Sequence, residues 1–301
     1  MTDRRTLDLA RQGAAMFKLH TGDCVDVLRT LPSGSVDSVV TSPPYAMQRK
    51  STYGGIPEKD YPAWTVEWMK EVWRVLKGDG SAIINIRPHI RNGQISDYVL
   101  RTRLALRESG WCELEELIWN KKSGAPLGSI HRPRRSWESL LWFGKHGRAY
   151  SAPKAAGQVS ESVGSTGGRI GPHIVDRKYI EQGGFKHVKP GIARVPDVVE
   201  MSTRLNADSN GLNDHPAPFP WQLAEWCGKL ITPPGGTILD PFTGSSSTGV
   251  AALKNGWHFI GIDQSEEYIE MSNRRLSAEL AEETEGGEQL NLPITLMANL
   301  R

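Results

Sequence analysis

Short apolar, β-branched runs alternate along the chain with longer stretches whose apolar residues recur at helical spacing. The first kind of pattern predicts strands and the second predicts helices. The expected strands are residues 35–41, 81–86, 113–119, 140–143, 237–240 and 257–263. Their alternation with helical stretches predicts an α/β fold, a mostly parallel twisted sheet flanked by helices.

Two helices have clear signals. An apolar stripe at helical spacing consists of Trp64, Trp68, Val72 and Val75, and it ends before the glycines at 78 and 80. We expect most of these side chains to be core. A second helix should begin after Ser265, a plausible N-cap, because Glu266 and Glu267 suit the positive first turn of a helix. We expect it to run to about residue 282.

The stretch from 145 to 214 is rich in Gly, Ser and basic residues and has weak periodicity. A loop of this length inside a compact domain is usually functional or disordered. We therefore predict one α/β domain built from 1–144 and 215–282, an irregular insertion at 145–214, and a C-terminal tail at 283–301.

Bulk composition narrows the class of protein only a little. The chain has 301 residues, with Lys+Arg 36 against Asp+Glu 34, so a polyanionic partner is neither demanded nor excluded. The three cysteines stand apart, which argues against a zinc site or disulfide framework, and we expect no metal. No apolar run reaches the roughly 20 residues of a membrane span, and the polar N-terminus lacks a signal-peptide core. We expect a soluble cytoplasmic protein, from a prokaryotic cell or encoded by a phage.

Residues 237–249 read as a strand that stops at Asp240, a turn of small residues through Gly244, and a helix starting near Thr248. This is the position where α/β sheets bind nucleotides, and small residues let a ligand approach the backbone. The next strand ends at Asp263, and 263 − 240 gives 23 residues, close to the spacing of about 20 at which an acid reaches ribose hydroxyls. Two acids favour a nucleoside over a triphosphate. A phosphate-binding loop would also need a lysine after Gly244, and none follows it. Taken alone, this motif could also be an ordinary strand-to-helix connection.

The other candidate site follows the strand at 35–41 and reads Ser42-Pro43-Pro44-Tyr45. Prolines lack N–H donors but keep their carbonyls, so the segment places a rigid edge of acceptors at a strand tip. Taken alone, it could be only a turn.

An exocyclic amino group of cytosine or adenine is a poor nucleophile because its lone pair is delocalised into the ring. Two acceptors, Ser42 Oγ and the Pro43 carbonyl, would localise that lone pair toward an electrophilic methyl group. Tyr45 would stack on the base, a contact worth about 1–3 kcal/mol. Methylation at cytosine C5 would instead need a nucleophilic cysteine, and none of the three has the Pro-Cys context of such enzymes.

On these motifs the chain resembles the β group of DNA amino-methyltransferases, over most of residues 17 to 275. Ser42-Pro43-Pro44-Tyr45 matches the family's catalytic motif, which precedes the cofactor motif. The cofactor-binding residues that the resemblance implies are Asp23, His215, Asp240, Pro241, Phe242, Gly244, Ser245 and Asp263. Asp23 could simply cap a helix.

The resemblance implies a Rossmann-like fold, S-adenosylmethionine as the cofactor, and double-stranded DNA as the partner, with the target base extruded from the helix. It also raises a cognate restriction endonuclease as a further partner, and a monomer or homodimer. The segment from 119 to 138 resembles the part that borders the extruded base, and Arg132, Arg134 and Arg135 in it are candidates for phosphate contact, against the alternative of a solvated face. Arg49 and Lys50 lie in a loop that could close over the base or be plain surface. The insertion at 145–214 is where target recognition would lie.

Ser at the first motif position is associated in this family mainly with cytosine N4, and Asp or Asn mainly with adenine N6. A hydroxyl can accept from either base, so the sequence favours cytosine N4 and leaves adenine N6 open. Two rivals also stay open. One is a protein glutamine methyltransferase, although those enzymes carry Asn first and reverse the motif order; the other is a DNA-binding relic without turnover.

Overall fold

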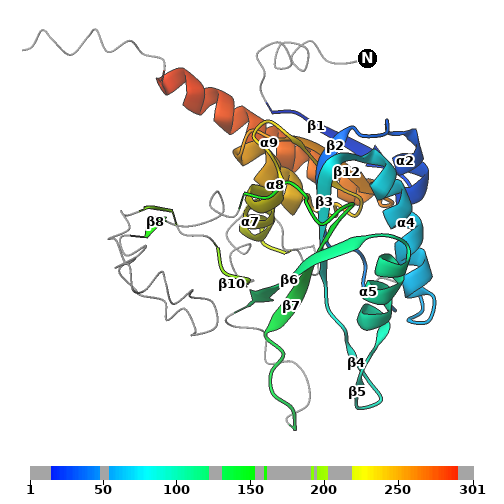
Figure 1. Ribbon diagram of the computed structural model, residues 1–301. Coiled ribbons are helices and arrows are strands. Elements are labelled where there is room, and N and C mark those ends of the chain that lie inside the picture. Colours follow the sequence, from blue (N-terminus) through cyan, green and yellow to red (C-terminus); the bar gives the residue numbers. More distant parts are fainter. Residues whose placement is uncertain are drawn as a thin grey trace, which may run out of the picture.

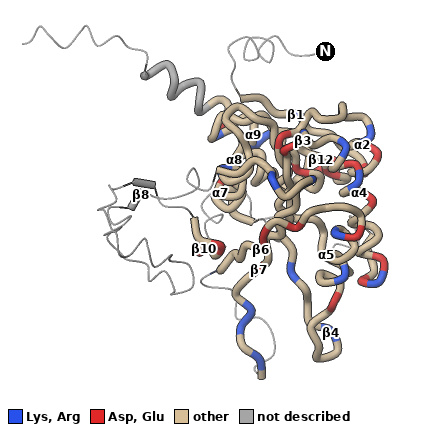
Figure 2. Tube along the Cα trace, viewed as in Figure 1, with Lys and Arg blue, Asp and Glu red and all other residues tan. Residues whose placement is uncertain are grey.

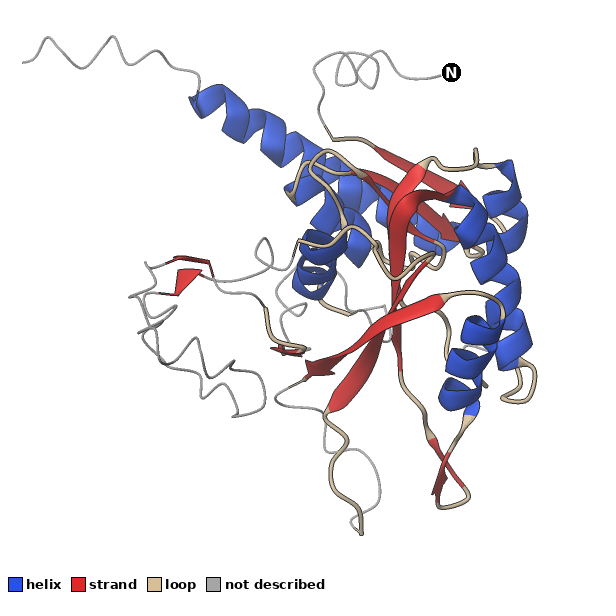
Figure 3. Cartoon of the chain, in the orientation of Figure 1, coloured by secondary structure: helices blue, strands red, loops and turns tan. Residues whose placement is uncertain are grey.

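The computed structural model describes residues 15–47, 54–121, 131–152, 159–160, 191–192, 195–202 and 219–290. Its main sheet has the strand order β1-β12-β11-β2-β3-β7-β6-β10 (Figure 3). The strands are β1 (Phe17–Thr21), β12 (His258–Asp263), β11 (Thr237–Asp240), β2 (Val36–Thr41), β3 (Leu76–Ile86), β7 (Trp137–Gly144), β6 (Cys112–Asn120) and β10 (Val198–Glu200). Only β7 runs antiparallel to its neighbours among these described strands. The predicted mostly parallel α/β sheet is confirmed.

Helices cover both faces of the sheet (Figure 1). One face carries α2 (Cys24–Thr30), α4 (Tyr61–Val75) and α5 (Tyr98–Glu108), and the other carries α7 (Trp221–Ile231), α8 (Ser247–Lys254) and α9 (Glu266–Leu290). Each face has its own apolar core. Trp68 and Val72 belong to the first core, whereas Leu230, Val250 and Leu276 belong to the second.

Helix α4 confirms the prediction made from its apolar stripe. Pro62 lies in its first turn, where a missing N–H costs nothing. Trp68 and Val72 are fully buried, and Trp64 is partly buried against the same core. The helix ends at Val75 because Leu76 is extended and opens β3 directly.

Strand β3 therefore starts five residues before the predicted start at Ser81. The glycines at 78 and 80 suggested a turn, but Gly80 lies within the strand. A Cβ at Gly80 would stand 2.7 Å from the Asp37 carbonyl oxygen, so glycine lets β3 approach β2 closely here. The close approach, rather than a turn, explains the residue.

Several elements were not predicted from the sequence: β1, α2, α5, α7, and a hairpin of β4 (Ile90–Arg91) with β5 (Gln94–Ile95). Within 145–214, Val198–Glu200 joins the main sheet beside β6, and β8 (Val159–Ser160) pairs with β9 (Gly191–Ile192). The proposed domain boundaries and the recognition role of this stretch remain predictions. No helix of the described residues is long and apolar enough to span a membrane.

Candidate active site

The two predicted halves of the site meet at one edge of the sheet. Strands β12, β11 and β2 are adjacent and parallel, so their carboxyl ends, which carry Asp263, Asp240 and Ser42, lie side by side. A direct bond joins the halves, since the Thr41 hydroxyl donates to Asp240 Oδ1 at 2.7 Å. Sequence positions 199 apart thus become neighbours.

Asp240 is 1% exposed, and its carboxylate is held by donors from the chain itself. Oδ1 accepts from Thr41 and from the Phe242 amide, and Oδ2 accepts from the Thr248 hydroxyl at 2.8 Å. Burial raises the pKa of Asp240 to about 6, although the hydrogen bonds from Thr41 and Thr248 oppose the rise. In this structure Asp240 therefore fixes the turn that follows β11.

We call residues 240–246 the Asp240 loop. Phe242 anchors it in the first core, with ring centroids 5.5 Å from Trp64 and 5.2 Å from Trp68. Gly244 (φ 50°) and Ser246 (φ 56°) are left-handed, which turns the chain sharply into α8. Helix α8 begins at Ser247, close to the predicted start near Thr248. Pro241 and Ser245 are buried in the same turn.

Asp263, also 1% exposed, ties neighbouring loops together. Its Oδ2 accepts from the Gly244 amide and its Oδ1 from the Ser265 amide, each at 2.9 Å. Its backbone carbonyl accepts from Gly22, after β1. Asp263 thus stands at the tip of β12 beside Gly244, where the sequence predicts a ribose-binding acid.

Asp23 is the N-cap of α2, and Oδ1 accepts from the Val25 amide at 2.8 Å. Its second oxygen accepts from Gln264 Nε2, directly after β12. The capping role is thus present, and the bond to Gln264 also draws Asp23 to the edge that carries Asp263. His215 lies outside the described residues.

On the catalytic side, Ser42 is half-buried, and Pro43 and Pro44 are buried. We call residues 42–45 the Ser42 edge. The Tyr45 hydroxyl donates to Glu138 Oε2 at 2.8 Å. Burial, followed by the charge of Glu138, raises the pKa of Tyr45 well above its usual value, so the phenol stays protonated.

Three further residues complete what we call the Glu138 cluster, which consists of Tyr45, Asn85, Lys121 and Glu138. Asn85 Nδ2 donates to Glu138 Oε2 at 3.0 Å and lies 3.5 Å from Ser42 Oγ. Lys121 Nζ donates to Glu138 Oε1 at 2.5 Å. Lys121 and Glu138 lie in the segment 119–138 that the resemblance assigns to the border of the extruded base, whereas Asn85 was not singled out from the sequence. One signal was available, because Asn85 interrupts an apolar run in β3 and is only 4% exposed.

The basic segment before β7 is fastened to the loop after β3. Arg135 donates to the Pro88 carbonyl at 2.5 Å, Arg132 donates to the Gly93 carbonyl, and Arg134 is exposed. Figure 2 shows basic positions on both segments at the same end of the molecule. A guanidinium has five N–H donors, so these contacts leave donors for phosphate. Arg49 and Lys50 lie outside the described residues.

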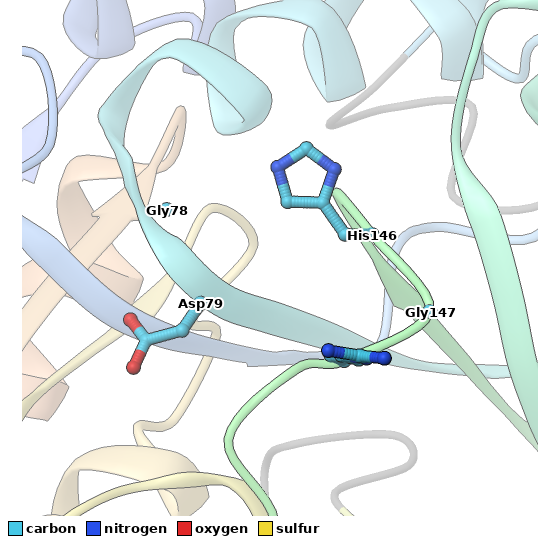
Figure 4. A pocket seen from close by; sticks show the side chains of 5 residues that line it. Gly78, Asp79, His146 and Gly147 are labelled. Atoms are coloured by element: carbon cyan, nitrogen blue, oxygen red, sulfur yellow. The ribbon is translucent and has the colours of Figure 1, made fainter.

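A hollow of about 730 Å³ lies away from this edge and is lined by Gly78, Asp79, His146, Gly147 and Arg148 (Figure 4). These residues come from the start of β3 and from the segment after β7, at the opposite end of both strands from Asn85 and Glu138. The hollow is thus separate from the motifs above. Among the described residues, no three His, Cys, Asp or Glu side chains are grouped to hold a metal.

None of the three cysteines lies in the Ser42 edge or the Asp240 loop. Cys24 and Cys227 are buried, and burial raises the pKa of both thiols. A thiol with a raised pKa is a poor nucleophile at neutral pH because the thiolate is the reactive form. This agrees with the expectation against methylation at cytosine C5.

Comparison with known proteins decides the family. The family model described as DNA methylase matches residues 36–274, which is more than half of the chain. The chain belongs to this DNA methylase family. It is 25% identical over 275 residues to the type II methyltransferase M.PvuII of Proteus hauseri, covering 84% of this chain and 82% of that protein. It is 28% identical to M.Cfr9I of Citrobacter freundii, covering 91% of each.

Solved structures confirm the predicted fold of this methylase. PvuII DNA methyltransferase (cytosine-N4-specific) superimposes with a TM-score of 0.65 at 24% identity and covers 86% of each chain. A putative DNA modification methylase from Thermus thermophilus, complexed with S-adenosyl-L-methionine, has a TM-score of 0.56 at 24% identity and covers 88% of this chain and 96% of its own.

Proposed function

We propose that this DNA methylase transfers a methyl group from S-adenosylmethionine to the N4 amino group of cytosine in DNA. The observation that carries the proposal is the Thr41–Asp240 hydrogen bond, because it sets the Ser42 edge beside the Asp240 loop. For a methyl group to pass from the cofactor to the base, the Ser42 edge that binds the base must lie beside the Asp240 loop that binds the cofactor. The likeness to a cytosine-N4-specific enzyme and the serine at position 42 support cytosine as the base.

The residues of the loop fit the cofactor. Gly244 has no side chain to block a ligand, and the Asp263 carboxylate lies beside it, where it would accept from ribose hydroxyls. The bonds of Asp240 to Thr41, Phe242 and Thr248 make it the residue that shapes this loop. When bound, S-adenosylmethionine supplies an electrophilic methyl group.

At the Ser42 edge, Ser42 Oγ and the Pro43 carbonyl accept the two amino N–H bonds of the target base. Tyr45 stacks on the ring, with its hydroxyl anchored on Glu138. The amino lone pair then points at the methyl group. The S–CH3 bond would break as the N–CH3 bond forms, with S-adenosylhomocysteine as the product, and one amino proton would pass to solvent. Arg132, Arg134 and Arg135 are proposed to hold DNA phosphates beside this edge.

Sequencing DNA with detection of modified bases, from cells expressing the protein, tests the proposal and identifies the target site. We expect N4-methylcytosine in one sequence context. Detection of N6-methyladenine would show that adenine is the target base instead. Unmodified DNA, together with transfer of label from S-adenosylmethionine to protein, would show that the substrate is a protein.

Ser42→Ala tests the mechanism with a matched control at the other end of the same strand. Loss of one preorganised hydrogen-bonding group costs about 10²–10³-fold in rate, so kcat should fall by about that factor while S-adenosylmethionine binding persists. Ser35→Ala removes a hydroxyl that bonds only to the Pro32 carbonyl in the described structure, and its kcat should match wild type. A fully active Ser42→Ala enzyme would refute the acceptor role.

A further inference from the structure

Ser42 can serve as an acceptor only if its own proton points away from the base. A hydroxyl has one donor and two lone pairs, and its rotation is free unless a neighbour fixes it. The arrangement around Ser42 Oγ therefore decides whether a lone pair or a proton meets the amino group.

The neighbours of Ser42 share a single chain of polar atoms. Asn85 Nδ2 lies 3.5 Å from Ser42 Oγ and 3.4 Å from Tyr45 Oη, so the two oxygens adjoin the same amide. Asn85 therefore donates to Ser42 Oγ, and the Tyr45 oxygen beside the same amide is the acceptor that we assign to the Ser42 proton. Tyr45 can accept that proton because it gives its own proton to Glu138.

Glu138 accepts hydrogen bonds at both of its carboxyl oxygens. The residue is 6% exposed, and Lys121 and Arg87 both face its Oε1, at 2.5 and 3.9 Å. Lys121 is itself placed by the Trp119 ring, with Nζ 4.5 Å from the ring centroid. The two cations lie beside Oε1, and Oε2 accepts from Tyr45 and Asn85.

We propose that Glu138 is a positioning residue for methyl transfer, acting through the Tyr45 hydroxyl to turn the Ser42 proton away from the base. The direction of every proton follows from the carboxylate. Tyr45 donates to Glu138, Ser42 donates to Tyr45 and accepts from Asn85, and the remaining lone pair of Ser42 is left for the target amino group. The same anchor holds the Tyr45 ring for stacking. This inference rests on the proposed function.

The alternative is that Glu138 only pairs with Lys121 and stabilises the β6–β7 ladder. In that case its replacement would affect stability or expression, and its effect on kcat would not depend on Tyr45. A double-mutant cycle on kcat separates the two roles, since groups that act as one unit show non-additive effects.

The cycle uses Glu138→Gln and Tyr45→Phe in the full-length protein. The substrate is a duplex containing the methylated site found by sequencing, with labelled S-adenosylmethionine. Each single variant should lose about tenfold in kcat, the size of one hydrogen bond. The double variant should also lose about tenfold, because Glu138 has nothing to act through once the Tyr45 hydroxyl is gone. KM for S-adenosylmethionine should stay near wild type throughout.

Glu113→Gln is the matched control. Glu113 also lies in the β6–β7 pair, is similarly covered (its side chain is 11% exposed against 8% for Glu138), and bonds to Arg103 at 2.6 Å. It pairs with Phe143, toward the opposite end of β7. We expect its kcat to remain near wild type and its effect to add to that of Tyr45→Phe.

An additive double variant, with about a hundredfold loss, would overturn the positioning role. So would wild-type kcat in Glu138→Gln. If Glu138→Gln fails to fold, Glu138→Asp, which keeps the charge and shortens the reach, takes its place in the cycle. A wild-type enzyme that methylates no DNA refutes the proposed function itself, whereas an active enzyme with an additive cycle refutes only this inference.

Discussion

The Asp240 loop and the Ser42 edge lie one hydrogen bond apart, yet they are stabilised in different ways. In the loop, Asp240 and Asp263 are 1% exposed and accept mainly from backbone amides and the hydroxyls of adjacent elements. At the edge, Glu138 accepts only from side chains of distant segments in the bonds the structure records, namely Tyr45, Asn85 and Lys121.

This difference indicates two kinds of task. Backbone bonds fix the shape of a loop that must present the same surface to one cofactor at every turnover. Side-chain bonds set the direction of protons and the orientation of a ring, and these can adjust when a base arrives. Substitutions should therefore have different consequences: loss of cofactor affinity and stability in the loop, and loss of kcat at the edge.

The largest effect on cofactor binding should come from Asp263→Ala. The change leaves the Gly244 and Ser265 amides without their acceptor and removes the acid placed for ribose contact. Hydrogen bonds to charged groups contribute about 1.5–3 kcal/mol each, so the Kd for S-adenosylmethionine should rise about 100-fold by calorimetry. Ser42→Ala should keep the wild-type Kd.

Asp97→Ala is the control, because Asp97 is exposed and pairs only with Arg101 among the bonds recorded for its side chain. Its Kd should not change. If Asp263→Ala bound the cofactor as tightly as Asp97→Ala does, the division between the two halves would be wrong.

Thr41→Val tests the link between the halves and should have a pH-dependent effect. The raised pKa of Asp240, about 6 against an ordinary 3.8, means that the folded state holds more protons than the unfolded state between these values. Stability therefore falls as pH rises through this window. Because the Thr41 hydroxyl favours the charged form, its removal raises this pKa further and extends the decline to higher pH.

Denaturant titrations should give a loss of about 1.5–3 kcal/mol for Thr41→Val at pH 8 and a smaller loss at pH 5, where Asp240 is mostly protonated. Thr65→Val is the control, since the Thr65 hydroxyl is equally buried but donates to the neutral Tyr61 carbonyl at 2.8 Å. Its loss should be the same at both pH values. Equal losses for Thr41→Val would exclude a charged Asp240 at pH 8.

Local sequence signals predicted those parts of the molecule that local interactions determine. The strands at 237–240 and 257–263, the tight turn after Asp240 and the helix near Thr248 depend on neighbouring residues, and all were found. The apolar stripe of α4 was also sufficient to predict that helix from the sequence. Helix α5 was missed because arginines at 101, 103 and 107 dilute its apolar pattern, although buried Leu106 and ion pairs to β6 stabilise it.

The resemblance placed the segment 119–138 beside the extruded base, but the bonds within the Glu138 cluster could not be predicted, for a different reason. Tyr45, Asn85 and Glu138 come from three separate segments, and only the antiparallel pairing of β7 with β3 brings Glu138 to the site. No spacing rule encodes that pairing. The sequence pointed to Ser42 and Tyr45 through their motif, but the partner that would direct their protons depends on the assembled sheet.

Gly249→Ala should have the smallest effect of these changes, and it tests how tightly the Asp240 loop is held from behind. Gly249 lies in α8, and an added Cβ would stand 2.7 Å from Phe259 Cε1 and 2.9 Å from Leu276 Cδ1. Overpacking costs about 1–3 kcal/mol, and the better helix propensity of alanine offsets up to about 1 kcal/mol of this. We expect a net loss of about 1 kcal/mol in denaturant titration. Gly147→Ala, where no atom lies within 4 Å of the added Cβ, should be neutral. Thr248 adjoins Gly249 and donates to Asp240, so a displaced α8 should also weaken cofactor binding. If Gly249→Ala lost stability but kept its cofactor affinity, the Asp240 loop would keep its shape without support from this helix.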